Sequence, residues 1–265
     1  MTDPAAAAAV TKGGIEIKGR VLPASNLTFF GEASLDGPAV RCIYKPIAGE
    51  RPLWDFPDGT LAAREVAAYV VSEELGWSVV PLTVMREGPA GVGMVQVWCD
   101  TDETQDPVDI VPIGEVPQGS LHVLDAIDGE GRHVSLVHED TDPLRRMAVF
   151  DAIVNNADRK GGHVLAMTDT HRYGVDHGVS FHIDNKLRTV LWGWADQPLH
   201  PDDERALSGL ADALATTGSR IREPLGKLLA GAEIDAFQGR VQSLLAGKKM
   251  PLPSGEWPAI PWPAF

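Results

Sequence analysis

Two aspartates, Asp158 and Asp176, stand in sequence settings that are typical of chemistry rather than of packing. Asp158 lies in a polar, glycine-containing loop, residues 155–163, which follows an apolar run with helical spacing. Asp151 is inside that run and is expected to be structural. Asp176 opens an Asp-His-Gly sequence after two short segments of strand-like composition. Carboxylates in such places can accept the proton of a hydroxyl group or bind a hard cation such as Mg²⁺. The alternative interpretation is an ordinary acidic loop followed by a β-turn. It is the weaker one, because two motifs in this order are harder to obtain by chance than one.

The order of helix, acidic loop, short strand, turn, strand and Asp-X-Gly resembles the catalytic core of the phosphatidylinositol 3-/4-kinase-like superfamily. It is most similar to type II phosphatidylinositol 4-kinases and HipA-type serine kinases, and the resemblance covers residues 45–194 in pieces. It implies that Asp158 faces the acceptor hydroxyl and that Asp176 binds the metal ion against the ATP phosphates. Those families place a metal-binding Asn five residues after the loop aspartate, where this sequence has His163. Because imidazole suits Mg²⁺ less well than an amide oxygen does, His163 is expected to be a metal neighbour with a shift toward Mn²⁺, or a phosphate hydrogen-bond donor.

A second pair of charged residues, Lys45 and Glu65, is expected to form an ion pair. Residues 40–46 have the composition of a strand that ends in lysine, and residues 61–75 have the apolar spacing of a helix with Thr60 as its N-cap. Glu65 falls on the apolar stripe of this helix, and a buried carboxylate needs a cationic partner. The resemblance implies that Lys45 contacts the α- and β-phosphates and that Glu65 orients it. The alternative is a solvent-facing lysine at a strand end.

Two further segments are expected to contact the nucleotide. Residues 13–33 are predicted to form a β-hairpin, and the resemblance implies that its turn covers the phosphates with Ser25 and Asn26. The hairpin has no GxGxxG sequence, so an ordinary hairpin is an equal alternative. Residues 93–99 are predicted to form a strand that leads into a hinge. By position alone, the resemblance implies that adenine contacts Gln96, Val97 and Trp98.

The composition limits the classes of partner. The chain of 265 residues has a formal net charge of −14, which argues against nucleic acid and against an anionic membrane surface. No apolar run is long enough for a membrane span, and the N-terminus has no basic region or long apolar core of a secretory signal. Two cysteines make no disulfide framework. A cytoplasmic protein is therefore expected.

The resemblance implies a two-lobed, protein-kinase-like fold of the α+β class. Residues 1–12 are expected to be disordered, residues 13–99 to form an N-lobe of one antiparallel sheet and one helix, and residues 100–265 to form a mostly helical C-lobe. Residues 100–128 are acidic and proline-rich, which indicates a surface insertion. The Pro/Trp-rich residues 251–265 are expected to be extended. Helices are predicted over residues 143–155, 201–215 and 233–245.

The resulting expectation is an ATP-dependent phosphotransferase that uses Mg²⁺ or Mn²⁺. The acceptor hydroxyl would belong to a protein serine or threonine or to an inositol-like soluble polyol, because the acidic chain suits a bilayer lipid less well. One alternative is a nucleotide-binding pseudokinase with a regulatory role, which His163 favours. Another is transfer of AMP instead of phosphate on the same fold.

Overall fold

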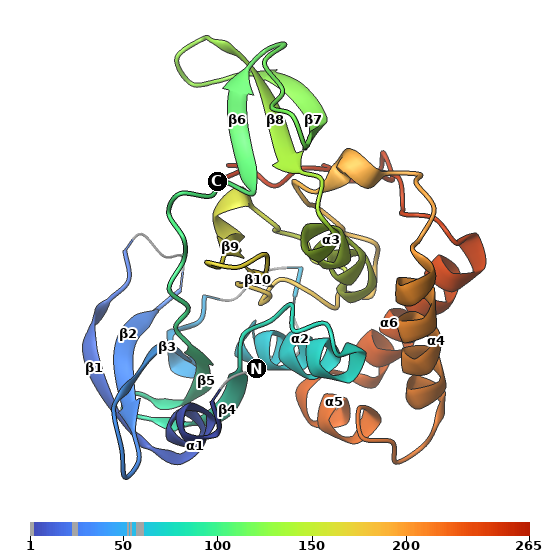
Figure 1. The fold of residues 1–265 in the computed structure, drawn as a ribbon. Helices are drawn as coiled ribbons and strands as arrows, with labels where there is room; N and C mark the ends of the chain where they lie inside the picture. Colours follow the sequence, from blue (N-terminus) through green and yellow to red (C-terminus); the bar gives the residue numbers. More distant parts are fainter. Residues whose placement is uncertain (1–2, 23–25, 52, 54, 57–60) are drawn as a thin grey trace.

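The computed structural model describes residues 3–22, 26–51, 53, 55–56 and 61–265, and it shows an α+β protein built from antiparallel sheets and helices (Figure 1). The α+β class predicted from the sequence is confirmed. Ser25 and Thr60 lie outside the described residues. Within these ranges, no helix combines the length and the apolar character that are needed to cross a bilayer.

The N-terminal part is an antiparallel sheet with the strand order β1-β2-β3-β5-β4. Alternating side chains of its central strands are buried, because a strand points successive residues to opposite faces. Cys42, Tyr44 and Val95 form the centre of its apolar face. The strands are β1 (Gly14–Arg20), β2 (Phe29–Ser34), β3 (Val40–Pro46), β4 (Thr83–Gly88) and β5 (Gly91–Val97).

The expectation that residues 1–12 are disordered is wrong for the part that the structure describes. Helix α1 (Pro4–Lys12) begins with Asp3 as N-cap, whose side chain accepts a hydrogen bond from the Ala5 N–H. Its alanines favour a helix, and Val10 is fully buried against the sheet. The guanidinium of Arg86 donates to the carbonyl oxygens of Val10 and Gly13, which satisfies the end of the helix.

Helix α2 (Leu61–Leu75) connects β3 to β4 and joins the sheet to the helical part of the molecule. Its predicted range is confirmed. The helix is buried on most sides because one side packs against β4 and β5 and another against helices α4 and α5. Small residues such as Ala67 and Ala68 allow this close packing on several sides. The position of Glu65 is therefore fixed by the main core.

Residues 100–265 are less helical than predicted. They contain a three-stranded antiparallel sheet, β6-β8-β7, which projects from the body at the top of Figure 1. Its strands are β6 (Val108–Pro112), β7 (Ser120–Ile127) and β8 (His133–Glu139). Pro112 is tolerated because it is the last residue of an edge strand. The expected surface insertion is thus a folded part of a sheet.

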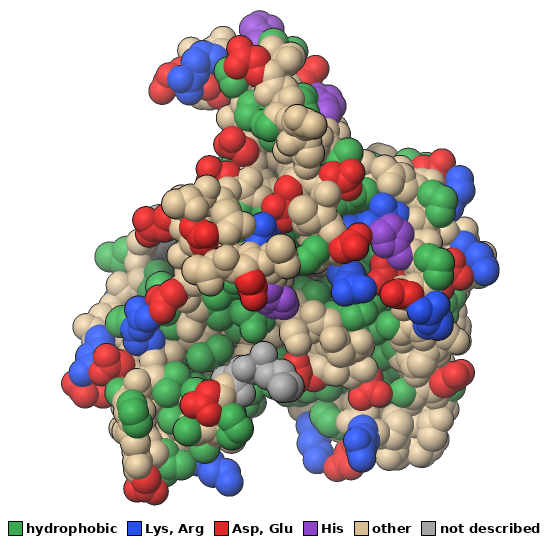
Figure 2. Space-filling model, in the orientation of Figure 1, with side chains coloured by type: hydrophobic (Ala, Val, Ile, Leu, Met, Phe, Trp, Pro, Cys, Tyr) green, Lys and Arg blue, Asp and Glu red, His purple; other side chains and the backbone are tan. Residues whose placement is uncertain are grey.

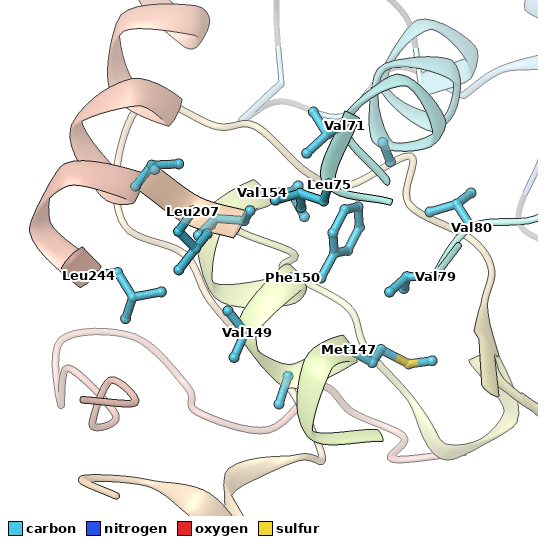
Figure 3. Packing of buried hydrophobic residues seen from close by; sticks show 14 of the residues in the cluster. Val71, Leu75, Val79, Val80, Met147, Val149, Phe150, Val154, Leu207 and Leu244 are labelled. Carbon is cyan, nitrogen blue, oxygen red and sulfur yellow. The ribbon is translucent and has the colours of Figure 1, made fainter. Parts of the chain in front are cut away.

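The main hydrophobic core surrounds helix α3 (Asp142–Val154), which delivers the acidic loop. Figure 3 shows Phe150, Val149 and Val154 of α3 between side chains of α2, α4 and α6. The remaining helices are α4 (Pro201–Ala215), α5 (Arg222–Leu228) and α6 (Gly231–Gly247).

Short elements complete the surroundings of the acidic loop. Strands β9 (Val164–Ala166) and β10 (Arg172–Gly174) form an antiparallel pair directly after it. Residues 251–265 contain no helix or strand, as predicted for this proline-rich segment, all of which the structure describes. Single 3₁₀ turns occur at Ile47–Gly49, Gly161–His163 and Trp192–Trp194.

Candidate active site

A cleft made of two adjoining cavities brings the predicted site residues together. The larger cavity, of about 500 Å³, and the smaller, of about 430 Å³, share Asn26, Lys45, Asp158 and Asp176. Glu65 lines only the smaller one. Ser25 lies outside the described residues. The larger cavity contains the other predicted residues, which are Gln96, Val97, Trp98 and His163.

Lys45 lies at the border of the two cavities and is held by two carboxylates. Its Nζ lies 2.6 Å from Glu65 Oε1 and 2.8 Å from Asp176 Oδ1. Strand β3 supplies the lysine, helix α2 supplies the glutamate, and the Asp-His-Gly segment supplies the aspartate. The ion pair between Lys45 and Glu65 that the sequence predicts is therefore present.

The three charges shift each other's proton affinities. The positive charge of Lys45 holds the pKa of Asp176 well below its usual range. Burial opposes the charge on Lys45, but Asp176 and Glu65 together outweigh it and raise the pKa of Lys45. Burial also raises the pKa of Glu65 to about 7, against the lowering effect of Lys45. Glu65 Oε2 is buried and has no hydrogen-bond partner in the described part of the chain.

The Asp-His-Gly segment packs tightly against α2. Asp176 has a left-handed backbone with φ of 61°, a conformation that aspartate adopts more readily than most residues. Its side chain is 49% exposed, and it faces the cleft. At Gly178, a Cβ atom would lie 3.2 Å from Leu61 Cβ and 3.7 Å from Glu65 Oε1. Glycine at this position therefore permits the close approach that lets Asp176 and Glu65 share Lys45.

The acidic loop begins where α3 ends, at Asn155, which has a left-handed φ of 57°. The Asn156 Oδ1 accepts a hydrogen bond of 3.0 Å from the Asp158 N–H, which orients the loop. Lys160 Nζ lies 3.4 Å from Asp158 Oδ2. Burial raises the pKa of Asp158 even though Lys160 opposes this shift. Asp158 is thus a more basic carboxylate than an exposed aspartate.

His163 and Asp176 face each other in a way that suits a cation. His163 Nδ1 lies 3.0 Å from the carbonyl oxygen of Asp158, and a carbonyl only accepts, so Nδ1 carries the proton. His163 Nε2 lies 3.4 Å from Asp176 Oδ2. Burial lowers the pKa of His163, so its neutral ring presents an Nε2 lone pair toward the carboxylate. Two acceptors directed at each other fit a shared cation.

These two side chains do not make a complete metal site. Within the described ranges, no group of three or more His, Cys, Asp and Glu side chains is placed to hold a metal ion. Mg²⁺ commonly binds proteins through one or two carboxylates together with waters and substrate phosphates. Asp176 and His163 could therefore hold such a cation only together with ligands from outside the protein.

Arg159 forms a buried support below the loop that the sequence did not reveal. Its Nε and Nη2 lie 2.8 and 2.9 Å from the two oxygens of Asp151, and Nη2 also lies 2.6 Å from His177 Nε2. Its Nη1 donates to the carbonyl oxygens of His163 and Val175. Arg159 thus ties α3, the acidic loop and the Asp-His-Gly segment together. The predicted structural role of Asp151 is confirmed.

The hinge segment offers less to a ligand than its position indicates. The Gln96 side chain is turned toward β4 and donates to Thr83 Oγ1 at 2.7 Å. The N–H groups of Val97 and Trp98 already donate to the carbonyl oxygens of Leu82 and Arg41. Cys99, which sequence reasoning did not select, also lines the larger cavity. The predicted contacts of a base with the Gln96 amide group and with the Val97 and Trp98 N–H groups would therefore compete with hydrogen bonds inside the protein.

The segment 251–265 also reaches the site. The Gly161 N–H donates to the Ala264 carbonyl oxygen at 2.8 Å, and the Phe265 ring lies where a Cβ of Gly161 would be. Trp257 lines the smaller cavity together with Arg188, whose guanidinium lies 5.5 Å from the indole ring centre. Residues at the end of this segment therefore pack against the acidic loop.

Comparison with known proteins gives a relative that matches nearly the whole chain. No family model matches the sequence. Protein Rv2133c of Mycobacterium tuberculosis is 51% identical over 267 residues, which cover 97% of this chain and 95% of that protein. Identity at this level over nearly the whole length of both chains shows common descent. The chain belongs to the family of Protein Rv2133c.

Proposed function

We propose that this protein is an ATP-dependent phosphotransferase with a two-lobed, kinase-like fold. It transfers the γ-phosphate of ATP to a hydroxyl of a protein serine or threonine, or of a small soluble polyol such as an inositol compound. The observation that carries the proposal is the position of Lys45 Nζ between Glu65 and Asp176 at the centre of the cleft. In protein kinases a strand lysine pairs with a helix glutamate and lies beside a metal-binding aspartate.

The two cavities suit the two substrates. The larger one has apolar walls from Ile43, Leu165 and Val175, which suit the flat adenine base. The smaller one lies on the other side of Lys45 and is bordered by Asp158, so the acceptor would enter there. The phosphates would then lie at the border, where Lys45 and Lys160 supply positive charge.

In the proposed reaction the acceptor oxygen attacks the γ-phosphorus and the bond between this phosphorus and the β-phosphate oxygen breaks. Asp158 accepts the hydroxyl proton, and its raised pKa makes it a stronger base than an exposed aspartate. ADP leaves with the electron pair. A divalent cation held by Asp176, His163 and the phosphates would neutralise phosphate charge. Catalysis would come mainly from positioning and charge stabilisation.

Labelled ATP tests the proposal. Purified protein with Mg²⁺ or Mn²⁺ and candidate acceptors should transfer label from γ-labelled ATP and none from α-labelled ATP. Asp158→Asn should lower this turnover by roughly 10²- to 10⁴-fold and leave nucleotide binding intact. Asp176→Asn should abolish the metal-dependent rise in melting temperature that ATP gives.

Other outcomes would contradict parts of the proposal. Transfer of the α-label would indicate AMP transfer. Nucleotide binding without turnover would favour the pseudokinase, an alternative that His163 in the position of a metal-binding Asn supports. Phosphorylation of phosphatidylinositol liposomes at a rate comparable to that of any soluble acceptor would contradict the proposal that the acceptor is soluble. No rise in melting temperature with any nucleotide and metal would overturn the proposal as a whole.

A further inference from the structure

A third cavity, of about 360 Å³, lies away from the cleft and shares no lining residue with it. Helix α3 contributes Ile153 to its wall, helix α6 contributes Arg240 and Ser243, and the following segment contributes Lys249. Its volume is within the range of small-molecule sites, which start at about 300 Å³. The other lining residues are Ala152, Asn185, Leu187, Trp192, Leu244, Pro251, Leu252 and Ser254.

The charge of this cavity is opposite to that of the chain. Its lining includes two cations, Arg240 and Lys249, and no aspartate or glutamate, although the whole chain has a net charge of −14. Acidic and basic side chains are interspersed over the face in Figure 2, as is usual for a protein surface. Lys249 makes an exposed ion pair of 2.9 Å with Asp196, which does not line the cavity. A locally positive cavity in an acidic protein favours an anionic ligand.

Arg240 has unused hydrogen-bonding capacity. Its Nε donates to the Ile153 carbonyl oxygen at 2.9 Å, and its Nη1 donates to the His182 carbonyl oxygen at 3.0 Å. Its Nη2 is buried without a hydrogen-bond partner in the described part of the chain. Burial lowers the pKa of Arg240 to about 10, so it remains charged at neutral pH. The charge of Glu233 partly offsets this burial, but no carboxylate lies within ion-pair distance of the guanidinium in the described part of the chain, and a buried cation gains from a closer anion.

The rest of the wall suits an organic ligand. The side chains of Asn185 and Ser243 make no hydrogen bonds within the described ranges, so both have donors available. Leu187, Trp192 and Leu252 supply apolar surface. Pockets of this kind combine an apolar wall with a few polar groups that fix the orientation of the ligand.

We propose that this cavity binds a small organic anion, with its phosphate or carboxylate group toward Arg240 and Lys249 and its apolar part toward Trp192 and the leucines. Both groups are oxyanions that a guanidinium fork and an ammonium group recognise. The site is separate from the proposed phosphotransferase cleft and does not depend on that function.

Titration with phenyl phosphate, benzoate and the neutral control phenol, followed by ligand-observed NMR, tests this site. At least one anion should bind more tightly than phenol, and the tighter of the two anions identifies the preferred oxyanion. Lys249→Gln should weaken anion binding by about 10-fold or more, because it removes a charge-assisted hydrogen bond. Arg240→Lys keeps the charge but loses the fork, and it should also weaken binding.

Two control variants make the result specific. Lys248→Gln changes the neighbouring lysine, which does not line this cavity, and should leave binding unchanged. Lys45→Met removes the main cation of the cleft, so anion binding that persists in this variant does not come from the nucleotide site. Anion affinity no higher than that of phenol, or unchanged by Lys249→Gln and Arg240→Lys, would overturn the proposal. So would anion binding that is lost in Lys45→Met.

Discussion

The acidic loop separates two groups of charged residues that differ in how far they are exposed to solvent. On the cleft side, Lys45, Glu65 and Asp176 share two short ion pairs, while Asp176 is 49% exposed and Glu65 Oε2 has no partner in the described structure. Below the loop, Arg159 makes hydrogen bonds with Asp151, His177 and two backbone carbonyl groups, and its side chain is fully buried. His177 Nδ1, on the far side of that ring, has no partner in the described structure.

This difference indicates a structural role for the Arg159 group and a ligand-binding role for the cleft group. The donors of Arg159 are directed at acceptors within the protein, so its group gains stability from a fixed arrangement and has little to offer a ligand. The cleft group keeps exposed and unpaired oxygens, which a substrate or a cation can use. Removing Arg159 should therefore mainly affect folding, whereas changes in the cleft group should affect proton binding and ligand binding.

The largest effect is expected for Arg159→Met. The substitution leaves the buried Asp151 carboxylate without its cation, and breaking such a pair typically costs about 3–5 kcal/mol of unfolding free energy. Urea denaturation measures this loss. Arg159→Lys is the matched variant, which keeps the charge but not the fork, and should lose less. If the unfolding free energy of Arg159→Met were within about 0.5 kcal/mol of the wild-type value, the buried group would not have the stabilising role that distinguishes it from the cleft group.

An intermediate effect is expected for Glu65→Gln, and it depends on pH. The folded-state pKa of Glu65 is about 7, above its ordinary value of 4.5, so the folded state binds the extra proton between these values. Wild-type stability should therefore fall as pH rises from about 5 to 7, by at most about 1.4 kcal/mol per pH unit for one proton. Glu65→Gln should lose this component.

Urea denaturation at pH 5, 6, 7 and 8 compares the two proteins. Glu74→Gln, at the exposed end of the same helix, should retain the wild-type pH dependence. Parallel curves for wild type and Glu65→Gln would show that Glu65 is charged throughout, and the cleft group would then resemble the buried one.

The smallest effect is expected for an ion pair outside both groups. Lys227 and Glu223 are one helical turn apart, 2.9 Å from each other and largely exposed. Lys227→Gln should leave the unfolding free energy nearly unchanged, because water and salt screen this exposed pair. A loss of several kcal/mol would show that burial does not explain the difference between the two groups of the loop.

Elements with strong periodicity could be predicted from the sequence. Strand β3 and helices α2 and α4 occur over the predicted residues because the alternation of the strand and the apolar spacing of the helices are regular there. Helix α1 has local signals, an N-cap at Asp3 and a run of alanines, that the prediction of disorder did not use, and Arg86, distant in sequence, completes its C-terminal end. The sheet β6-β8-β7 was missed because its prolines and acidic residues are typical of loops, and only pairing in space satisfies its backbone.

The candidate site was predictable where a charge conflicted with its surroundings. Glu65 on an apolar helix face required a cation, and Lys45 provides it. The contacts that Arg159 and Trp257 make at the site depend on how separate segments meet in space. The same holds for Gln96, whose side chain is turned to Thr83 by the register of two strands.

The contact of Gly161 with Ala264 and Phe265 has a consequence for how the protein is made. At roughly 5–20 residues per second, a ribosome needs on the order of 5 to 20 seconds to extend the chain from Gly161 to Ala264. During this time the acidic loop has no partner on that side. The loop that carries Asp158 therefore reaches its final arrangement only after these late residues have been synthesised and have folded back onto it.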